Sequence, residues 1–584
     1  LTISDSLESI GSYAFSGCVS FLHTPDLTNV VSIGDYAFEG CTLLTEIKAL
    51  DGCATFGEAI FTACENIAKL TIQFQDNVEQ FYISTFFGNR DYLEGDNNYY
   101  VVTLDDSSEY YVPRSLMEVE YKGAGEIPDY FCYKLETLTT FKDTSASTTS
   151  IGESAFDGCL DMNSYVSVST DVEAIKDSAF KDCNSLSGLP AFSPESIGSY
   201  AFSGCVSLLQ TPGLSGVVSI GDYAFEGCTL LTEINFGADP KIESLGVGSF
   251  ENCSSISKFN SSVVGEMIIP GSVLTLANSV FKNLNFISKV VIPHSVNYIG
   301  DSVFSGFSSL SYIELPFVGN SISATGEDAN FGSIFGTSSY TNSYLAIQGS
   351  DLTYYIPKGL SKIKIGGQTI AEKALRNLTS VTDLTIADSV TSIGEGALNG
   401  CSSLVNITAP KVTGYNTNVT SYYDYSGSWN KDEDTFTFST STISSSLNTE
   451  YITFNSACNL TLKYCLTGKT YSSSSNSYIY LSILKNGSTL YSCYSTTLVT
   501  RNISVSAGDT LTFSFKKNSY SGYESGASVA MTGATSISSS PSFGVIFGKD
   551  SYSGSYSDFY DNKIPSSLTN INLTSANCVP EYTF

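Results

Sequence analysis

The sequence predicts a mainly β fold, a solenoid of stacked units of about 23 residues that carries an inserted antiparallel β-sandwich. The phrase SIGDYAFEGCTLLTEI occurs twice, at 32–47 and at 219–234, and weaker copies recur along the chain. The residues that close each unit alternate between apolar and polar, which is typical of a half-buried strand. The period is lost across 411–541, where strand-like runs are separated by turn signals such as KNGS.

The units align on the apolar residue that closes each Ala-Phe pair, here called the anchor. The commonest gap between anchors is 23 residues, and two gaps measure 70 and 71 residues. The anchors are Phe15, Phe38, Phe61, Phe131, Phe156, Phe180, Phe202, Phe225, Phe250, Phe281, Phe304, Leu375 and Leu398.

Apolar spacing predicts the structure of one unit. Counting from Phe304, Leu310 stands at +6, Ile313 at +9 and Leu315 at +11. Positions +9 and +11 therefore face inward on a short strand, and positions +8 and +10 face outward. The run IG-x-x-A-F favours a short helical turn before each anchor. Because one unit cannot bury its apolar face alone, the units must stack, and we expect one continuous parallel sheet.

The consensus I-G-x-x-A-F-x-x-C-x-x-L-x-x-I-x-I/L-P resembles the BspA-type (Treponema-like) leucine-rich repeat. SIGDYAFEGCTLLTEI and YIGDSVFSGFSSLSYIELP carry it almost whole. The resemblance implies a leucine-rich-repeat solenoid in a non-catalytic protein, extracellular, at the cell surface or secreted, that mediates adhesion or protein–protein interaction. Its implied partners are surface proteins or glycans of a host or a neighbouring cell.

The repeat pattern divides the chain into three parts. Residues 1–410 are predicted to form the solenoid, with variant segments at about 83–126 and 331–370 inside the two long gaps. Each long gap is close to three periods, so we expect strand-rich segments that keep the stacking. Residues 411–541 form a linker and the β-sandwich, and 542–584 resume the repeats and stop inside a unit. We interpret both chain ends as cuts, with any export signal or anchor outside.

Nine of the 15 cysteines occupy one repeat position, three residues after the anchor. Phe307, Leu284 and Leu378 take this position in other units, so it is a buried apolar site and the thiols should be inert. The nine are Cys18, Cys41, Cys64, Cys159, Cys183, Cys205, Cys228, Cys253 and Cys401. A disulfide among Cys458, Cys465 and Cys493 stays open.

Composition excludes several functions. A net charge of −30 disfavours nucleic-acid binding, which needs a basic footprint. No apolar stretch is long enough to span a membrane as a helix. Two histidines, His23 and His294, cannot build a three-histidine zinc site, and neither lies in a catalytic motif. No metal site, cofactor or catalytic residue is predicted, and enzymatic activity is disfavoured.

Two sets of residues are candidates for recognition. Each member of the first set, taken alone, could be a solvated strand residue. The outward strand positions are Glu46, Lys48, Lys69, Glu233, Asn235, Lys258, Lys289, Tyr312, Glu314 and Asp383. The alternative function is carbohydrate binding by the sandwich, where aromatic rings could stack on sugars; ordinary strand tyrosines would give the same pattern. The candidates are Trp429, Tyr480, Tyr491 and Tyr520.

Overall fold

The chain forms two compact units in a computed structural model. The solenoid unit comprises Leu1–Ser389, Gly396–Thr408 and Ile564–Asn572, and the second unit comprises the remainder. The structure describes residues 7–409, the strands that lie between 427 and 532, and 565, 567–568 and 570–573. Gaps within the first range fall at 26, 28, 51–52, 75–79, 90–92, 94, 368 and 395.

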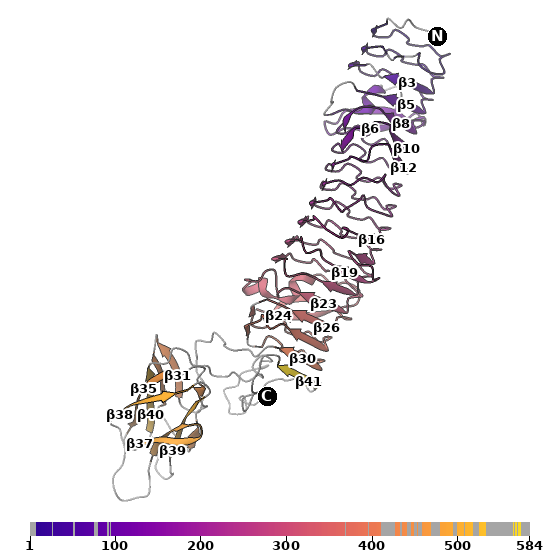
Figure 1. The fold of residues 1–584 in the computed structure, drawn as a ribbon. Helices are drawn as coiled ribbons and strands as arrows, with labels where there is room; N and C mark the ends of the chain where they lie inside the picture. The colour runs from indigo at the N-terminus through magenta and orange to yellow at the C-terminus, as the bar shows by residue number, and fades with distance from the viewer. Residues whose placement is uncertain are drawn as a thin grey trace, which may run out of the picture. The chain divides into compact units, whose positions relative to one another are not determined.

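Most coils of the solenoid unit run from a short strand, usually of two residues, through a tight turn to a second strand, and successive coils stack (Figure 1). The turn is held by bonds of two kinds. Within the coil, the Cys41 N–H donates to the Phe38 carbonyl at 3.3 Å. Between coils, the Phe38 N–H donates to the Ile60 carbonyl at 2.9 Å. Alternate N–H groups are thus used by the next coil, so the turn cannot continue as a helix.

The expected short helical turn is therefore wrong. The described residues contain 3₁₀ helices and turns but no α-helix. Left-handed backbone interrupts each turn at two places, as at Tyr36 (φ 54°) and Gly40 (φ 71°). A helix needs right-handed residues throughout, and these positions point successive N–H groups along the solenoid axis instead.

The two-residue strands build one side of the solenoid unit. They form a parallel three-stranded sheet, β1-β2-β4, and a parallel eight-stranded sheet, β9-β11-β13-β14-β15-β17-β20-β22. The same short strand recurs at β27 (Thr369–Ile370) and β29 (Ser392–Ile393). The bounds are β1 (Ser9–Ile10), β2 (Ser32–Ile33), β4 (Thr55–Phe56), β9 (Gly125–Ile127), β11 (Thr148–Ile151), β13 (Ala174–Ile175), β14 (Ser196–Ile197), β15 (Ser219–Ile220), β17 (Ser244–Leu245), β20 (Thr275–Leu276) and β22 (Tyr298–Ile299). We call this side the serine sheet.

The second strand of each coil builds the other side. It forms a parallel five-stranded sheet, β3-β5-β8-β10-β12, and a parallel nine-stranded sheet, β16-β18-β19-β21-β23-β26-β28-β30-β41. The bounds are β3 (Glu46–Leu50), β5 (Lys69–Ile72), β8 (Glu118–Tyr121), β10 (Thr140–Asp143), β12 (Ser164–Ser167), β16 (Glu233–Ile234), β18 (Lys258–Phe259), β19 (Glu266–Ile268), β21 (Lys289–Val291), β23 (Tyr312–Leu315), β26 (Lys362–Ile365), β28 (Asp383–Ile386), β30 (Asn406–Ala409) and β41 (Asn570–Leu573).

The expectation of one continuous sheet is wrong, because this second side breaks between β12 and β16. The two coils in the break carry Pro190 and Pro212 at position +10. Proline has no N–H for a neighbouring strand and is excluded from sheet interiors. The first coil carries Pro25 at the same position, and there only an isolated bridge between His23 and Glu46 forms.

Each long gap between anchors adds only one strand to the sheets of this second side, although the length of the gap equals about three periods. In the first gap, β8 pairs with β5 and β10, while the antiparallel hairpin β6 (Tyr99–Thr103) and β7 (Glu109–Pro113) is inserted before it. The 3₁₀ helix η1 (Ile83–Phe86) replaces the usual turn.

The second gap has the same arrangement of one added parallel strand, an inserted hairpin and 3₁₀ helices. β26 pairs with β23 and β28, and the hairpin is β24 (Ser343–Gln348) with β25 (Leu352–Pro357). Its 3₁₀ helices are η3 (Gly326–Ala329) and η4 (Phe331–Phe335). The predicted strand-rich character and the kept stacking describe both segments.

The core is a column of anchor rings. Phe38, Phe61, Leu44 and Ile47 are fully buried, as the repeat frame predicts. Consecutive rings stack nearly parallel: the Phe202 and Phe225 centroids lie 5.1 Å apart at 8°. One anchor was misplaced. The Cys132 N–H, and not that of Phe131, makes the anchor's bond to the next coil, with Ala155 O at 2.7 Å.

The cysteine ladder lies beside the rings. Eight of its nine members are buried and Cys18 is half-buried, and all nine are free thiols. Each buried thiol donates to the carbonyl of the preceding anchor, as Cys205 does to Phe180 at 3.0 Å. Burial raises the pKa of Cys401 to about 12, with a hydrogen bond from the Leu378 backbone opposing it. The position is therefore a buried apolar site, at which cysteine can also donate a hydrogen bond.

The described strands of the second unit are antiparallel and form two sheets. One has the order β31-β32-β40-β35-β38 and the other β33-β39-β36-β37, with β34 beside β39. The bounds are β31 (Gly427–Asp432), β32 (Thr435–Thr440), β33 (Ser446–Asn448), β34 (Ile452–Thr453), β35 (Cys458–Gly468), β36 (Ile479–Lys485), β37 (Ser488–Cys493), β38 (Val499–Val505), β39 (Thr510–Lys517) and β40 (Ser525–Thr532). A sandwich of these sheets, its boundaries and the open disulfide stay predictions; the side chains of Cys458, Cys465 and Cys493 lie outside the description.

Candidate functional site

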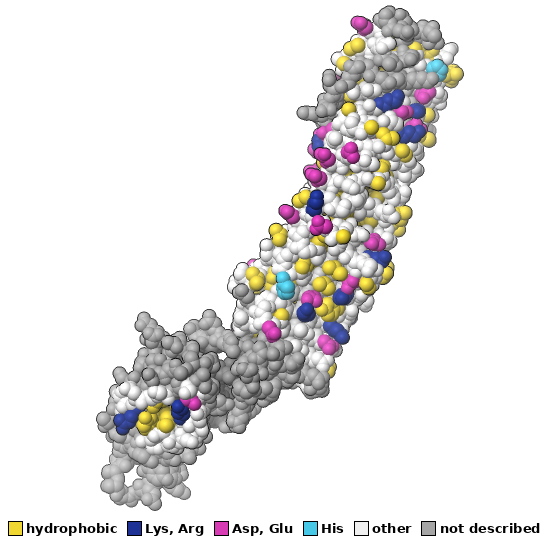
Figure 2. Space-filling model, in the orientation of Figure 1, with side chains coloured by type: hydrophobic (Ala, Val, Ile, Leu, Met, Phe, Trp, Pro, Cys, Tyr) yellow, Lys and Arg dark blue, Asp and Glu magenta, His cyan; other side chains and the backbone are white. Residues whose placement is uncertain are grey.

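Two surfaces of the solenoid unit present polar side chains in regular rows. On the side of β5, β8 and β10, Lys and Glu side chains lie next to each other (Figure 2). On the serine sheet the outward side chains are short and mostly uncharged. The two surfaces therefore offer different chemistry to a partner.

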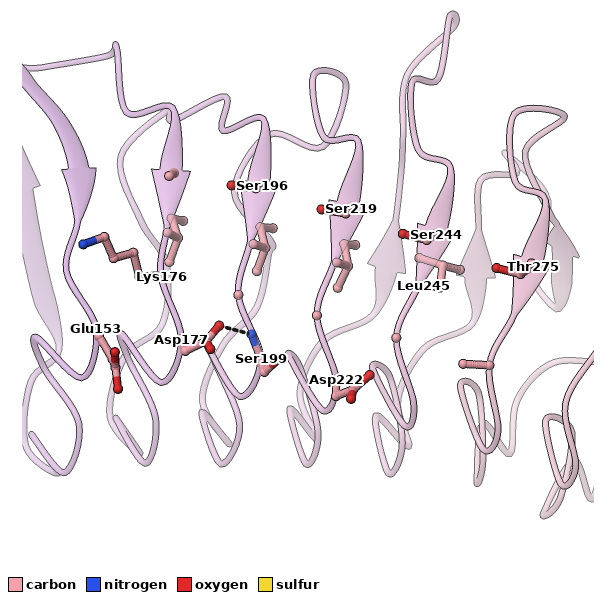
Figure 3. A pocket seen from close by; sticks show the side chains of 18 residues that line it. Glu153, Lys176, Asp177, Ser196, Ser199, Ser219, Asp222, Ser244, Leu245 and Thr275 are labelled. Carbon is pink, nitrogen blue, oxygen red and sulfur yellow. Dashed lines mark hydrogen bonds between the residues drawn. The ribbon is translucent and has the colours of Figure 1, made fainter.

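The serine sheet is hollowed over β13, β14, β15, β17 and β20, in a depression of about 770 Å³. Its outward row, one residue from each strand, lies on successive coils (Figure 3). The row consists of Ala174, Ser196, Ser219, Ser244 and Thr275. Hydroxyl groups at this spacing can donate and accept hydrogen bonds.

The acids beside this hollow are used by the fold. Asp177 Oδ1 accepts the Ser199 N–H of the next coil at 2.7 Å, and Asp222 Oδ1 accepts that of Val247 at 2.7 Å. The glycine of each SIG phrase is equally constrained, because a Cβ on Gly221 would lie 2.4 Å from the Ser199 nitrogen. Packing between coils therefore dictates this surface.

The second surface, here called the charged face, is the outward side of the sheets from β3 to β12 and from β16 to β30. Alternation of side chains along each strand puts positions +8 and +10 on it, while parallel pairing in register brings the same positions of neighbouring coils together. Glu46 thus stands beside Lys69, and Lys69 beside Glu118.

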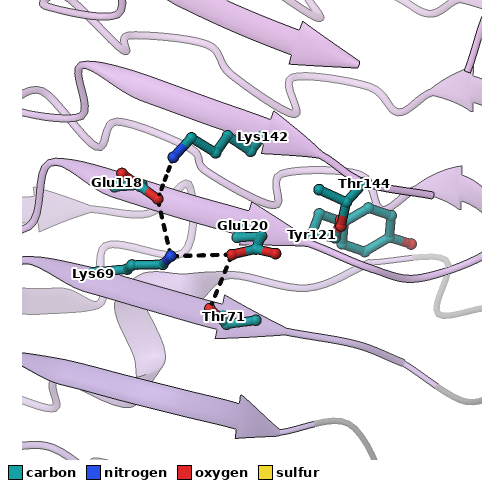
Figure 4. Close-up of polar contacts among 7 residues, drawn as sticks. All are labelled: Lys69, Thr71, Glu118, Glu120, Tyr121, Lys142 and Thr144. Carbon is teal, nitrogen blue, oxygen red and sulfur yellow. Dashed lines mark hydrogen bonds and ion pairs between the residues drawn. The ribbon is translucent and has the colours of Figure 1, made fainter. Parts of the chain in front are cut away.

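The N-terminal part of the charged face contains a four-residue ion-pair network (Figure 4). Lys69 Nζ lies 3.2 Å from Glu118 Oε1 and 3.1 Å from Glu120 Oε2. Lys142 Nζ contacts Glu118 Oε1 at 2.7 Å. The Thr71 hydroxyl donates to Glu120 at 3.5 Å. Four side chains from three strands thus fix one another in place.

The network shifts its own pKa values. Partial burial opposes the charge on Glu118, but hydrogen bonds from Lys142 and Lys69 outweigh it and lower the pKa of that carboxyl. Burial likewise opposes the charge on Lys69, and its bonds to Glu120 and Glu118 raise the pKa of the amine. Both groups are held in their charged forms.

The C-terminal part repeats the arrangement in separate pairs. Lys258 lies 3.3 Å from Glu233, Lys289 2.8 Å from Glu266. The hydrogen bond from Lys289 lowers the pKa of Glu266. Lys289 Nζ also lies 5.6 Å from the Tyr312 ring centroid, within cation–π range.

Glu314, on β23, forms the next ion pair of this part of the charged face. It contacts Lys364 Nζ at 2.6 Å and accepts the Tyr312 hydroxyl at 3.0 Å. Burial and then this bond to Glu314 raise the pKa of Tyr312 to about 12. Opposite charges again alternate from one coil to the next.

The predicted outward residues lie where the alternation puts them, with two qualifications. Asn235 is exposed but follows β16 and does not belong to it, and Lys48 lies in β3 with its side chain outside the description. At the last rungs, the Asn406 side-chain amide donates to Asp383 Oδ1 at 2.8 Å. Binding by these residues stays a proposal.

Sequence reasoning missed half of the residues that form the ion pairs of the charged face. Glu118, Glu120, Glu266 and Lys364 lie in coils that have no Ala-Phe phrase, so the anchor count skipped them. Counted from Phe131, Lys142 stands at the inward position +11; counted from Cys132, it stands at the outward position +10. The alternating runs EVEY and KIKI were the available signals.

The aromatic candidates of the second unit are not brought together by the described structure. Tyr491, on β37, lies under the Arg501 guanidinium, 5.9 Å from the ring centroid. Trp429 and Tyr480 lie in β31 and β36 with side chains outside the description, and Tyr520 is outside it altogether.

Within the described part of the chain, no cluster of three His, Cys, Asp or Glu side chains could hold a metal ion. The same part contains no helix that is both long and apolar enough to cross a membrane.

The fold and its outward rows define a repeat protein of the leucine-rich-repeat class. The chain belongs to the BspA type leucine rich repeat region family, whose model of six copies matches residues 1–93, 125–257, 195–331 and 354–472, more than half of the sequence. No curated protein matches.

Solved structures give a weaker likeness. A leucine-rich repeat protein from Bacteroides ovatus is 20% identical over 70% of this chain and 75% of its own, with a TM-score of 0.25. A leucine rich cell surface protein from Faecalibacterium prausnitzii is 20% identical over 54% and 93%, with a TM-score of 0.26. The pneumococcal vaccine antigen PcpA is 14% identical over 68% and 88%, with a TM-score of 0.26. The family assignment rests on the repeat match alone.

Proposed function

We propose that this chain is a non-catalytic protein, displayed at a cell surface or secreted, that binds a protein partner through the charged face. The observation that carries the proposal is the network of Lys69, Glu118, Glu120 and Lys142 on a rigid sheet. Its side chains are only one fifth to two fifths exposed, yet point away from the core.

Such a network suits recognition. Because the long side chains are already held by their neighbours, a partner need not immobilise them, which reduces the entropic cost of binding. Opposite charges at fixed spacing favour a partner with the complementary pattern and disfavour others. A carboxylate such as Glu118, whose pKa is lowered by its lysine partners, is a poor general base, which supports binding over catalysis.

The surface location is proposed from the family. Among the similar structures, the Faecalibacterium protein is described as a cell surface protein. Adhesion to proteins of a host or a neighbouring cell is the role that a long, rigid face of this kind would serve.

Carbohydrate binding by a sandwich between residues 411 and 541 stays a prediction without a supporting observation. Tyr491 already faces Arg501. Expression of residues 430–541 alone tests the module: a soluble β-rich domain with a cooperative melt supports it, and an aggregated product argues that these strands depend on the repeats.

Binding of the whole chain to a panel of purified extracellular-matrix proteins tests the proposal. The double variant Lys69→Gln, Lys142→Gln removes both lysines of the network while keeping their side-chain length. We expect it to weaken binding about tenfold or more without lowering the melting temperature beyond a few degrees. Wild-type chain that binds no protein of the panel, or a variant that binds equally well, would contradict the proposal.

A further inference from the structure

The solenoid unit contains two nearly identical copies of one stretch of sequence. Residues 9–47 and 196–234 are identical at 34 of 39 positions. Each copy spans two coils, and each forms the same strands at the same places, β1 and β2 in the first and β14 and β15 in the second. The two copies therefore present nearly the same residues in the same local structure.

In each copy, the turn of each of the two coils carries one tyrosine, and the two tyrosine rings stack on each other. The rings of Tyr13 and Tyr36 lie 5.1 Å apart at 15°, and those of Tyr200 and Tyr223 lie 5.2 Å apart at 16°. All four residues have left-handed backbone, with φ between 54° and 62°. Bulky residues rarely adopt this conformation, so the turns position these rings at a conformational cost.

The first tyrosine of each pair is exposed, Tyr13 by 52% and Tyr200 by 39%. The same four aliphatic positions of each copy are exposed as well. They are Val19, Leu22, Val31 and Leu43 in the first copy and Val206, Leu209, Val218 and Leu230 in the second. The two copies therefore expose apolar side chains at the same positions.

The charged residues within both copies are all acidic, and the two lysines of the coil before the second copy, Lys176 and Lys181, are paired with acids. Neither copy contains a single Lys or Arg. Beside the second pair, Glu226 accepts the Ser203 hydroxyl at 3.4 Å. Burial, then Glu251 and other nearby acids, raise the pKa of Tyr223. Aromatic faces and nearby carboxylates attract cations.

A third tyrosine cluster lies on the same edge between the copies. Tyr82 and Tyr130 stack at 5.1 Å, and Tyr133 meets both edge-on. There Lys134 Nζ lies 4.7 Å from the Tyr133 ring centroid. This edge therefore already shows the cation–aromatic contact that the two copies could offer to a partner.

The separation of the pairs follows from the stacking. Hydrogen bonds join successive turns from Tyr13 to Tyr200 in seven steps. At about 4.8 Å per step, the two exposed tyrosines are about 34 Å apart. An extended chain of roughly ten residues covers this distance.

We propose that this edge of the solenoid unit binds an extended polypeptide segment rich in Lys and Arg, which contacts both tyrosine pairs at once. The pairs supply aromatic surface, the nearby acids supply charge complementarity, and the fixed spacing makes the second contact intramolecular once the first has formed.

The test uses the whole chain and two synthetic peptides of alternating Arg and Ser, one of about 16 residues and one of four, since only the longer can span both pairs. The variants are Tyr13→Ser, Tyr200→Ser and both together. Serine occupies the equivalent position with left-handed backbone at Ser154 and Ser178, so these turns tolerate it. Tyr298→Ser is the control, because Tyr298 is 40% exposed on β22 outside both copies.

For the long peptide, either single variant is expected to lose about tenfold or more in affinity, because bivalency is lost. For the short peptide, each single variant loses about twofold, since one site remains, while the double variant loses binding of both peptides. The control binds like wild type. Equal losses in the control and the single variants would overturn the proposal, as attraction to net negative charge would explain them. Tyrosine-dependent binding of a neutral linear oligosaccharide, without tyrosine-dependent peptide binding, would also overturn it.

Discussion

The two sides of the solenoid unit differ in how much freedom their outward positions have. On the serine sheet a glycine stands two positions after the outward residue in most coils, and a Cβ there would strike the previous coil's backbone, as at Gly221. On the charged face the outward residues range over Lys, Glu, Asp, Thr and Tyr without altering the strand register.

This difference indicates where recognition can develop. A surface dictated by contacts between coils cannot change its chemistry without loss of stability, whereas a surface that points away from all packing can. The following changes test that contrast, from the largest expected effect to the smallest.

Removal of a buried anchor ring, which packs beneath both sides, should lower the free energy of unfolding most. Phe225→Ala deletes a fully buried side chain stacked between Phe202 and Phe250. We expect a loss of about 3–5 kcal/mol in the free energy of unfolding, measured by denaturant titration with hydrogen exchange of neighbouring coils. Phe286→Ala removes the same ring from a site that is 60% exposed and is the control; an equal loss there would contradict the core assignment.

A methyl group on the serine sheet should cost less. In Gly221→Ala the new Cβ would lie 2.4 Å from the Ser199 nitrogen, so the coils must separate locally. We expect a loss of about 1–3 kcal/mol, read as a shift of the denaturation midpoint. The matched change Gly271→Ala, where nothing lies within 4 Å, should leave the midpoint unchanged. Similar shifts in both would show that packing does not restrict this side.

The smallest effect on stability is expected from a change on the charged face, and this effect depends on pH. The pKa of Glu118 is lowered in the folded chain, so its contribution to stability is present above the unfolded pKa and is lost as the pH falls through the folded pKa. Glu118→Gln should therefore cost about 0.2–1 kcal/mol at neutral pH and nothing once both states are protonated. Thermal melts of both proteins at several pH values measure this, and a pH-independent difference would disprove it.

The periodic part of this fold could be predicted from the sequence. Phe38, Leu44 and Ile47 were placed correctly because their positions recur in every coil, and repetition makes the inward set unambiguous. The same reasoning put Lys69 and Glu314 on the outward side.

The features that the sequence did not predict depend on single residues within individual coils. The break of the sheet follows from one missing N–H at Pro190 and another at Pro212, which the consensus does not register. The shift from Phe131 to Cys132 moved Lys142 from the interior to the charged face. Ion pairs such as Lys364 with Glu314 join residues 50 positions apart, and only the pairing of β23 with β26 brings them together.

The most direct test compares the two sides in one binding measurement. Dissociation constants for an extracellular-matrix protein that the wild-type chain binds would be measured for the Lys69→Gln, Lys142→Gln variant and for Ser244→Lys, which puts a long charged side chain on the exposed row of the serine sheet. We predict a loss of about tenfold or more for the first variant and no change for the second. Weaker binding by Ser244→Lys, with the charged-face variant unaffected, would contradict the assignment of recognition to the charged face.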